Sequence, residues 1–390
     1  MSSQPSIHYL SQAVVSGYGV AARRLVRALD SVGAKLRWTP MPDAGVLPTT
    51  VPDGFGREFD RLVSAGVRHD VTCFHDIPEW VTMVTRDDRP WIAHTVWEAD
   101  RMPSHWPPIL NSFAGVLVPC RWNADVFAMD GVTVPIGVVP HVADLFDETA
   151  GGWAGDEGRF DSRDVLDSLG VPDDTCVVTT IGHWNARKDP GLAVRAFLRA
   201  FTADDPVVLV VKTAPQTWLG DLETPGSRAG TADWELAHVV SKFARPAQVV
   251  LVTEFWPEYA IRALHRATDC YLTLSHGEGW GLGAFDAATL GVPVVAPGYG
   301  GLLDYLDPSD AYFVDHALVR PRFSVAYSYE AHQRWAEPDI EHAADLLRYV
   351  FDHREEASQR GARAAERIAR DFAPSVVAAQ FLDFAASFVG

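Results

Sequence analysis

The stretch Ser275–Gly301, SHGEGWGLGAFDAATLGVPVVAPGYGG, carries most of the residues whose types and spacing suit chemistry. It follows a strand-like run and begins with a loop rich in glycine, which lets a backbone approach a ligand closely. A helix is predicted to begin at Leu282, and the unpaired N–H groups and positive dipole of a helix start attract phosphate. Glu278 comes just before this helix, where its carboxylate can bind hydroxyl groups attached beyond the phosphate. The stretch therefore predicts a site for a phosphorylated ligand that carries hydroxyls.

Asp286 has an unusual position in the predicted helix. It comes four residues after Leu282 and four before Leu290, so it shares a stripe with two apolar residues and needs a polar partner. A ligand hydroxyl would be such a partner. The alternative is that the glycines form an ordinary strand-to-helix turn and that both acids are solvated, and the loop alone leaves that choice open. The two acids together favour a functional site.

A basic pair, Arg187-Lys188, lies in the segment IGHWNARKDP, between a predicted strand and a predicted helix. Two cations at a helix start suit a diphosphate, because they place fixed positive charge where leaving-group charge develops. Their alternative role is that of a solvated surface pair. The position after a strand and before a helix favours the functional interpretation.

The N-terminal half contains a second glycine loop, Ser16–Gly19, before a helical pattern that starts at Val20. The segment GYGVAA also fits the loose dinucleotide pattern G-x-G-x-x-A, which would indicate an oxidoreductase. In that fingerprint the glycines end the first strand, whereas about six residues separate IHYL from Gly17, so hydride transfer is a weak alternative. His94 lies near the end of another predicted strand, WIAHT, and a lone histidine is more often structural than catalytic.

Strand-like and helix-like segments alternate along the chain. The predicted strands of the second half are CVVTTI, PVVLVV, QVVLV, CYLTL and PVVA, and those of the first half include VTCF, WIAHT, GVLVP and IGVVP. Helical patterns follow Pro190, Pro257 and Pro338, and proline suits the first position of a helix. Short apolar strands alternating with helices indicate parallel sheets covered on both faces, which bind ligands at the carboxyl ends of their strands.

Composition narrows the classes of partner. The 390 residues suit two domains, and a net charge of −18 disfavours binding to nucleic acid or to anionic lipid. No apolar run is long enough to span a bilayer, the N-terminus lacks a signal-peptide pattern, and four scattered cysteines suit a reducing compartment. We therefore expect a cytoplasmic protein with a small-molecule ligand and no integral membrane segment. No spacing of His, Cys, Asp or Glu predicts a metal site.

The motifs together resemble the donor-binding signature of the family 4 glycosyltransferases, in which a Glu, seven residues and a second acid precede a small-residue helix and G-x-P-V-V. Glu278 and Asp286 stand at the two acidic positions. Between them, Gly279, Trp280, Gly281 and Leu282 match the family's Gly, aromatic, Gly and aliphatic residues. The family prefers Glu at the second position, where the acid grips the ribose, so Asp286 is one methylene shorter and affects donor affinity or nucleotide choice.

The resemblance extends over most of the chain. In the family, an Arg and a Lys after the first strand of the C-terminal domain clamp the diphosphate. Lys188 matches the lysine, His183 replaces the arginine, and Arg187 can supply the missing charge.

Two features of the N-terminal half also match the family. Gly17 and Gly19 resemble its N-domain glycine loop, which approaches the donor phosphates, and His94 matches a histidine beside the donor sugar. Val376–Phe388 resembles the family's last helix, which crosses back to the N-terminal domain.

The resemblance implies an α/β protein of GT-B fold, with two doubly wound, Rossmann-like domains facing a central cleft. We place an acceptor-side domain at 1–145, a nucleotide-sugar domain at 146–371 and the returning helix at 372–390. The implied activity is retaining, metal-independent transfer of a sugar from a nucleotide diphospho-sugar, which is a substrate, so no cofactor is expected. Glu278, His94 and Lys188 would be catalytic. The acidic composition favours a soluble small-molecule or glycan acceptor.

Three alternatives share this fold or this ligand: a sugar phosphorylase, a nucleotide-sugar epimerase and a non-catalytic nucleotide-sugar-binding protein. The departures at His183 and Asp286 are the features that favour the non-catalytic alternative.

Overall fold

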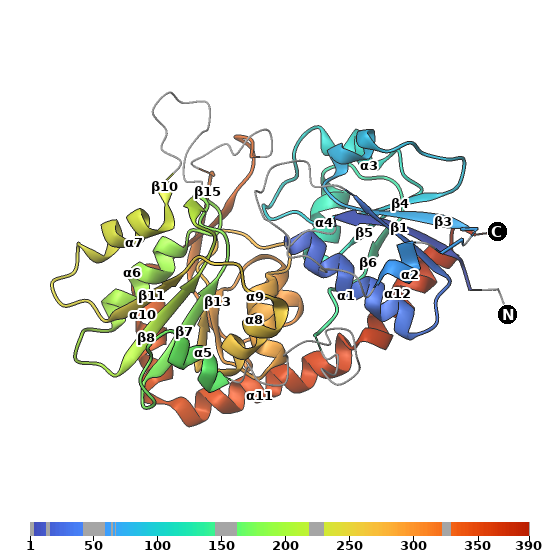
Figure 1. Cartoon of the computed structure of the whole chain (residues 1–390). Coiled ribbons are helices and arrows are strands. Elements are labelled where there is room, and N and C mark those ends of the chain that lie inside the picture. The colour runs from blue at the N-terminus through green and yellow to red at the C-terminus, as the bar shows by residue number, and fades with distance from the viewer. Residues whose placement is uncertain are drawn as a thin grey trace. The chain divides into compact units, whose positions relative to one another are not determined.

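The computed structural model describes residues 4–12, 16–41, 59–63, 65–66, 68–144, 162–217, 230–321 and 329–389. The chain forms two compact α/β units, which Figure 1 shows in cartoon form. The first unit contains Met1–Trp97, Arg101–Trp153 and Ala369–Gly390, and the second contains Glu98–Asp100 and Ala154–Ile368. The predicted domain boundary at 145/146 lies outside the described residues, and the boundary at 371/372 stays a prediction.

The first unit is built on a six-stranded parallel sheet of order β2-β1-β3-β4-β5-β6. Its strands are β1 (Ile7–Gln12), β2 (Leu36–Met41), β3 (Val71–His75), β4 (Trp91–His94), β5 (Gly115–Val118) and β6 (Ile136–Val138). Its helices are α1 (Gly17–Ser31), α2 (Asp60–Val63), the 3₁₀ helix η2 (Pro78–Met83), α3 (Trp106–Leu110), α4 (Arg121–Met129) and α12 (Pro374–Ala386). The strand order reverses between β1 and β3, and ligands bind at such a reversal in open α/β sheets.

The C-terminal helix α12 completes the core of the first unit. It packs against α1, and its Phe381 is fully buried with a ring centroid 6.0 Å from that of Tyr9 on β1. Gly137 on β6 leaves room for Phe384, since a Cβ there would lie 2.6 Å from the Phe384 ring. The last residues of the chain therefore stabilise the unit formed by its first half.

The second unit has a six-stranded parallel sheet of order β11-β8-β7-β12-β13-β14. Its strands are β7 (Cys176–Ile181), β8 (Val207–Lys212), β11 (Gln248–Val252), β12 (Cys270–Leu272), β13 (Val294–Pro297) and β14 (Tyr312–Val314). Two antiparallel pairs, β9 (Gln216–Thr217) with β10 (Gly230–Thr231) and β15 (His316–Val319) with β16 (Trp335–Pro338), accompany it. Its helices are α5 (Ser162–Ser168), α6 (Pro190–Ala200), α7 (Ala232–Val240), α8 (Glu258–Arg266), α9 (Leu282–Thr289), η5 (Gly300–Asp304) and α10 (Ile340–Asp352), while α11 (Arg354–Asp371) leads to α12.

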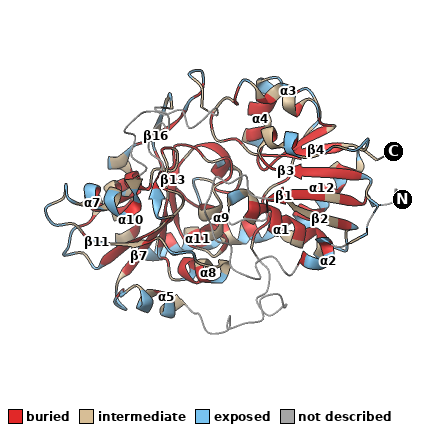
Figure 2. Cartoon of the chain, turned by 45° about the horizontal axis from the view of Figure 1, so that its top comes forward, coloured by how far each residue is buried: buried red, intermediate tan, exposed pale blue. Residues whose placement is uncertain are grey.

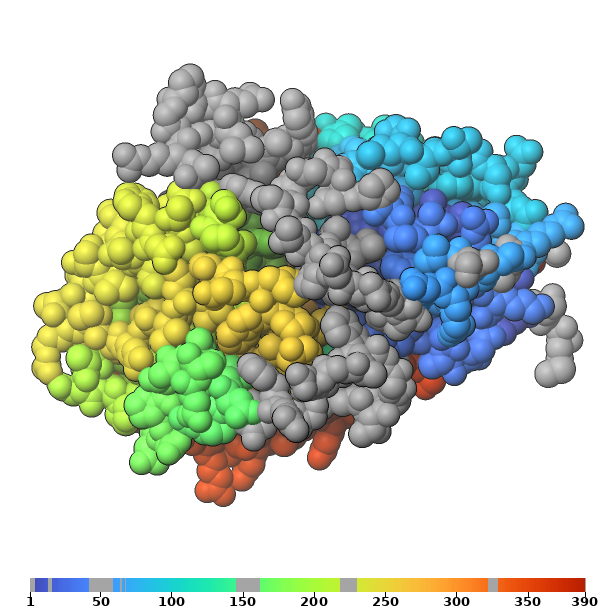
Figure 3. Space-filling view, in the orientation of Figure 1, coloured from blue at the N-terminus to red at the C-terminus, as the bar shows by residue number. Residues whose placement is uncertain are grey.

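Burial follows the layers of both units. The strands are mostly buried, as the red ribbons of Figure 2 show, which agrees with the continuous apolar runs in the sequence. Helices present a buried face to a sheet and an exposed face to solvent, and α5 (green) is visible at the surface in Figure 3. The sequence prediction of doubly wound α/β architecture is confirmed.

Helix starts differ in part from those expected. Pro190 is the first residue of α6 as predicted, but Pro257 is the residue before α8, and Pro338 ends β16. The start of α10 is capped by Asp339, whose carboxylate accepts the backbone N–H of Glu341 at 2.9 Å. Proline therefore marks these boundaries without always being the first helical residue.

Candidate active site

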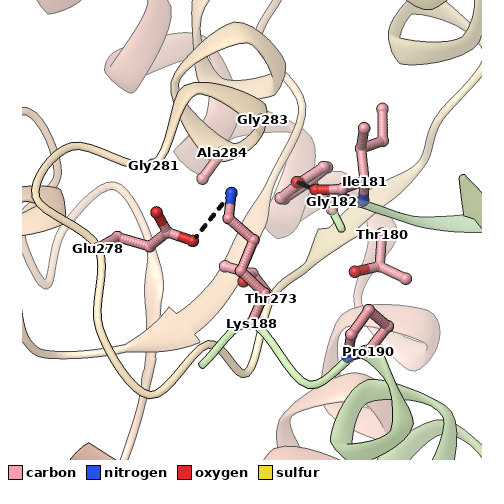
Figure 4. Close-up of a pocket in the computed structure, with 11 residues that line it drawn as sticks. Thr180, Ile181, Gly182, Lys188, Pro190, Thr273, Glu278, Gly281, Gly283 and Ala284 are labelled. Carbon is pink, nitrogen blue, oxygen red and sulfur yellow. Dashed lines mark hydrogen bonds and ion pairs between the residues drawn. The ribbon is translucent and has the colours of Figure 1, made fainter. Parts of the chain in front are cut away.

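A small pocket lies where the strand order of the second sheet reverses, at the carboxyl ends of β7 and β12 (Figure 4). It is lined by Thr180, Ile181, Gly182, Lys188, Pro190, Tyr271, Thr273, Glu278, Gly281, Gly283 and Ala284. The cavity of about 20 Å³ is large enough for one water molecule. Side chains therefore fill most of this position, and a ligand of nucleotide size has to displace them.

Lys188 and Glu278 form an ion pair across the pocket, with Lys188 Nζ 3.5 Å from Glu278 Oε1 (Figure 4). The Glu278 side chain is 12% exposed. Burial would raise the pKa of Glu278, but Lys188 and Arg187 outweigh burial and hold that pKa below its ordinary value. Glu278 is therefore an ionised hydrogen-bond acceptor beside a cation, a combination that suits sugar hydroxyls next to a phosphate.

The loop before α6 positions Lys188. The Asn185 side-chain oxygen accepts the backbone N–H groups of Arg187 at 3.2 Å and of Lys188 at 2.8 Å, which fixes a tight turn. Gly182 leaves space for the lysine, because a Cβ there would lie 3.2 Å from Lys188 Cδ. The turn and the absent side chain together direct Lys188 into the pocket.

The glycines at Gly281, Gly283 and Gly301 are required by a positive φ or by a close contact. Gly281 precedes α9 with a φ of 84°, which favours glycine, and α9 begins at Leu282 as predicted. A Cβ on Gly283 would lie 2.1 Å from the hydroxyl of Tyr271. Gly301, in the turn after β13, donates its N–H to the carbonyl of Glu278 at 2.8 Å, and its own Cβ would lie 2.0 Å from a neighbouring carbonyl. The turn at Gly301 thus supports the loop that carries Glu278.

Arg187 lies behind Glu278 and does not line the pocket. Its guanidinium donates to the carbonyl of Gly277 at 2.5 Å and pairs with Glu278 and Glu98. Burial would lower the pKa of Arg187, but the two carboxylates raise it above its ordinary value. The expected diphosphate contact of Arg187 is therefore a prediction that this geometry does not support directly.

Other expected donor residues have different surroundings. Trp280 is buried, with ring centroids of Phe285 and Tyr305 at 5.1 and 5.0 Å, so its indole belongs to the core. His183 is half-buried, and burial together with the nearby lysines and Arg187 lowers its pKa to about 4. Asp286 is half-buried on α9 and does not line the pocket. Gly279 is buried behind Glu278, and Leu282 is half-buried at the helix start.

The first unit holds Gly17 and Gly19 in the first turn of α1, three residues earlier than the predicted start at Val20. Ser16 is the reason, because its side chain accepts the N–H of Gly19 at 3.0 Å and caps the helix. A Cβ on Gly17 would meet no atom of the described residues within 4 Å. Gly17 is thus not required by packing, which leaves space for a ligand at this helix start.

His94 lies at the end of β4 and is 1% exposed. Its ring stacks on that of His75 with centroids 3.9 Å apart, and the described residues provide no hydrogen-bond partner for either ring nitrogen. His75 is held by the hydroxyl of Tyr9, 2.6 Å from its Nδ1. Burial lowers the pKa of His94 to about 3, so the ring is neutral.

Sequence reasoning missed several residues that form the site. Tyr271, Thr273 and Thr180 line the pocket from strand ends, and each reads in the sequence as an ordinary strand residue. Glu98 belongs to no motif in the sequence, yet it pairs with Arg187 at 3.2 Å. The adjacent glycines Gly300-Gly301 were an available signal, because such a pair after a strand predicts a close backbone approach.

The comparisons with known proteins agree with this geometry. Residues 163–381 match the family described as "Family 4 Glycosyltransferase in conflict systems". The chain belongs to this family of glycosyltransferases.

Curated relatives are D-inositol 3-phosphate glycosyltransferases. The protein of Acidothermus cellulolyticus is 33% identical over 158 residues, which are 40% of this chain and 32% of that protein. The protein of Corynebacterium jeikeium is 27% identical over 248 residues, 60% of this chain and 55% of its own length. The chain thus spans between a third and about half of the length of these relatives.

Solved structures show the same fold over nearly the whole chain. The crystal structure of Anabaena HepE in complex with UDP-glucose has a TM-score of 0.67 at 14% identity and covers 98% of this chain and 100% of its own. Sucrose-phosphate synthase from Thermosynechococcus elongatus has a TM-score of 0.66 at 15% identity and covers 98% and 99%. The predicted GT-B fold and the predicted family are therefore confirmed.

The described residues contain neither a candidate membrane span nor a candidate metal cluster. No helix in the ranges described above is long and apolar enough to cross a membrane. Within the same ranges, no three His, Cys, Asp or Glu side chains are grouped so that they could hold a metal ion.

Proposed function

We propose that the chain is a retaining glycosyltransferase that moves a sugar from a nucleotide diphospho-sugar to an acceptor without a metal ion. The observation that carries the proposal is the Lys188–Glu278 pair at the ends of β7 and β12, where a carboxylate that is 12% exposed faces a cation at 3.5 Å. When a donor binds, the ion pair between Lys188 and Glu278 is replaced by one contact from each side chain to the donor. Its phosphate takes Lys188, and its sugar hydroxyls take Glu278.

Backbone N–H groups at the start of α9 would stabilise the remaining negative charge of the diphosphate. The first N–H groups of α9 lack partners within the helix, and the helix dipole adds positive charge at Leu282. Lys188 and these amides stabilise the diphosphate as it leaves, which is the charge a metal ion would otherwise balance. We assign the ribose to Asp286 and a contact with the sugar to His94.

The proposed reaction is a same-face displacement. The bond between sugar C1 and the β-phosphate oxygen breaks while the acceptor nucleophile bonds to C1 on the same face. The acceptor's proton passes to the departing phosphate oxygen, so nucleoside diphosphate and the glycosylated acceptor are the products. The enzyme then acts mainly through positioning and electrostatics. The relatives act on D-inositol 3-phosphate by name, and we propose a soluble small molecule or glycan as the acceptor class.

A panel of UDP-, GDP- and ADP-sugars in a thermal-shift assay tests donor binding, because a ligand of the native state raises the melting temperature. The donor that binds is then incubated with candidate acceptors, with and without EDTA, and the products are analysed by NMR. We expect nucleoside diphosphate, an unchanged anomeric configuration and no effect of EDTA. Inverted product or loss of activity with EDTA would refute the corresponding part. Sugar phosphate would indicate a phosphorylase, an isomerised donor an epimerase, and donor binding without turnover a binding protein.

A further inference from the structure

The short segment Glu98–Asp100 belongs to the second unit, although the chain on both sides of it belongs to the first. The N–H of Asp100 donates to the carbonyl of Arg334 at 3.0 Å, and the Asp100 carboxylate accepts the N–H of Arg334 at 2.6 Å. The carbonyl of Glu98 packs directly on Gly277, where an added Cβ would lie 2.1 Å from it. These contacts fix the backbone of Glu98 against the loop that carries Glu278.

The Glu98 side chain reaches Arg187 from this fixed position. Glu98 Oε1 lies 3.2 Å from Arg187 Nη2, while Nη1 of the same guanidinium lies 3.3 Å from Glu278 Oε2. Nη1 also donates to the carbonyl of Gly277 at 2.5 Å. Arg187 thus has acceptors on both terminal nitrogens, and its planar shape sets the direction of both carboxylates.

Placing two carboxylates, Glu98 and Glu278, beside the single guanidinium of Arg187 costs desolvation free energy. Burial and the charge of Glu278 raise the pKa of Glu98, and Arg187 offsets only part of that rise. The Glu98 side chain is 21% exposed, so its carboxylate loses most of its hydration beside a guanidinium that already pairs with Glu278. A carboxylate with a raised pKa beside a specific charged partner is a candidate for a functional role.

The ion pair between Glu98 and Arg187 also keeps a cation beside Glu278 when a donor binds. When a donor phosphate takes Lys188, Glu278 loses the cation that lies 3.5 Å from it, and Arg187 becomes its remaining ionic partner. If Arg187 turned to the phosphate as well, Glu278 would have neither cation to hold it. A carboxylate on the far side of Arg187 prevents that movement, because it holds the guanidinium where it is.

Resting on the proposed function, we propose that Glu98 is a positioning residue, which holds Arg187 so that Arg187 orients Glu278 toward the sugar instead of binding the diphosphate. The role is indirect, since Glu98 does not line the pocket. This role predicts opposite effects on nucleotide affinity and on the rate of transfer when the charge of Glu98 is removed. Loss of the Glu98 charge frees a cation for the diphosphate and thereby strengthens the binding of nucleotide, while it weakens the orientation of Glu278 and thereby slows transfer.

The test compares Glu98→Gln, Glu98→Asp and the matched control Asp100→Asn, which removes one charge from the same segment and keeps the acceptor oxygen for Arg334. Nucleoside diphosphate affinity is measured by calorimetry with UDP, GDP or ADP, whichever the wild type binds best, and kcat and KM are measured with the donor. We expect Glu98→Gln to bind the diphosphate about threefold or more tighter and to lose about tenfold or more in kcat, without a lower melting temperature. Glu98→Asp should recover part of kcat, and Asp100→Asn should match the wild type.

Wild-type kcat in Glu98→Gln, weaker binding of the diphosphate, or equal losses in Asp100→Asn would overturn the proposal. A loss of kcat that follows a lowered melting temperature and is not recovered by Glu98→Asp would also overturn it, because a merely structural role gives that result. The calorimetric readout does not depend on turnover. If the wild type transfers no sugar from any donor, the proposed function fails, and the diphosphate affinity of Glu98→Gln then tests only whether Glu98 holds Arg187 away from the diphosphate.

Discussion

The buried histidines of the first unit make a quantitative prediction about acid stability. Burial lowers the pKa of His94 to about 3, and burial with the charges of His94 and Arg24 lowers that of His141 to about 3. The pKa of His75 is also lowered, by burial and by the charges of His94 and His141. In the unfolded chain each imidazole has its ordinary pKa of about 6.5. Below that pH the unfolded state binds more protons, so stability falls as the pH falls toward the folded pKa.

The magnitude follows from linkage. Each histidine that is neutral when folded and protonated when unfolded costs about 1.4 kcal/mol for each pH unit. Between about pH 6 and pH 4 a folded pKa of about 3 therefore costs about 2 to 3 kcal/mol for His94 alone. His94→Phe keeps a ring that can stack on His75 but removes the proton site. As the pH is lowered, the free energy of unfolding of this variant should fall less steeply than that of the wild type. The two slopes should differ by about 1.4 kcal/mol per pH unit.

Urea unfolding at several pH values, followed by circular dichroism, measures the two slopes. His238→Gln is the control, because His238 is exposed on α7 and its replacement should leave the slope unchanged. Parallel stability curves for the wild type and His94→Phe would refute the inference that His94 is a buried neutral group. A steeper curve for the variant would refute it as well.

Three further predictions concern the site. Lys188→Ala and Glu278→Ala should each lower turnover by at least about a hundredfold while the circular dichroism spectrum is kept, and near-native turnover with saturating donor would remove that residue from the mechanism. Gly301→Ala should lower the free energy of unfolding by about 1 to 3 kcal/mol in urea titrations, because its Cβ would lie 2.0 Å from the carbonyl of Gly279; an unchanged midpoint would show that the turn can relax. Gly17→Ala should leave the melting temperature unchanged, since no atom in the described part of the chain lies within 4 Å of its Cβ, yet raise the donor KM severalfold; an unchanged KM would exclude a close approach of donor to Gly17.

The architecture could be predicted from local patterns, because parallel strands that are buried on both faces appear as short apolar runs. The strand β7 coincides with the run CVVTTI, and α9 begins at Leu282 after a glycine of positive φ, as the loop chemistry indicates. The start of α1 was wrong by three residues, because Ser16 caps the helix and the glycines 17 and 19 join its first turn. The antiparallel pair β15–β16 carries no comparable pattern, because HALV and WAEP each include a polar residue and are not continuous apolar runs.

The site was predictable where spacing along the chain encodes it and unpredictable where it depends on distant pairing. Glu278 and Lys188 were chosen from motifs, and the structure brings them together at 3.5 Å. Arg187 was expected to face the diphosphate, but the guanidinium lies against Glu98, a residue 89 positions away in the sequence that no local motif connects to it. Trp280 matches a family position, yet the sequence does not show that its indole packs on Phe285 in the core.

The central claim is that Lys188 and Glu278 exchange their mutual ion pair for a nucleotide diphospho-sugar. Calorimetric titration of the preferred donor into the wild type, Lys188→Ala and the control Lys242→Ala tests it most directly, because Lys242 is an exposed lysine that lies outside this pocket. The account predicts binding of one donor per chain to the wild type and to Lys242→Ala, with affinity lower by about tenfold or more in Lys188→Ala. Equal donor affinity in all three proteins, or no binding of any nucleotide diphospho-sugar to the wild type, would contradict it.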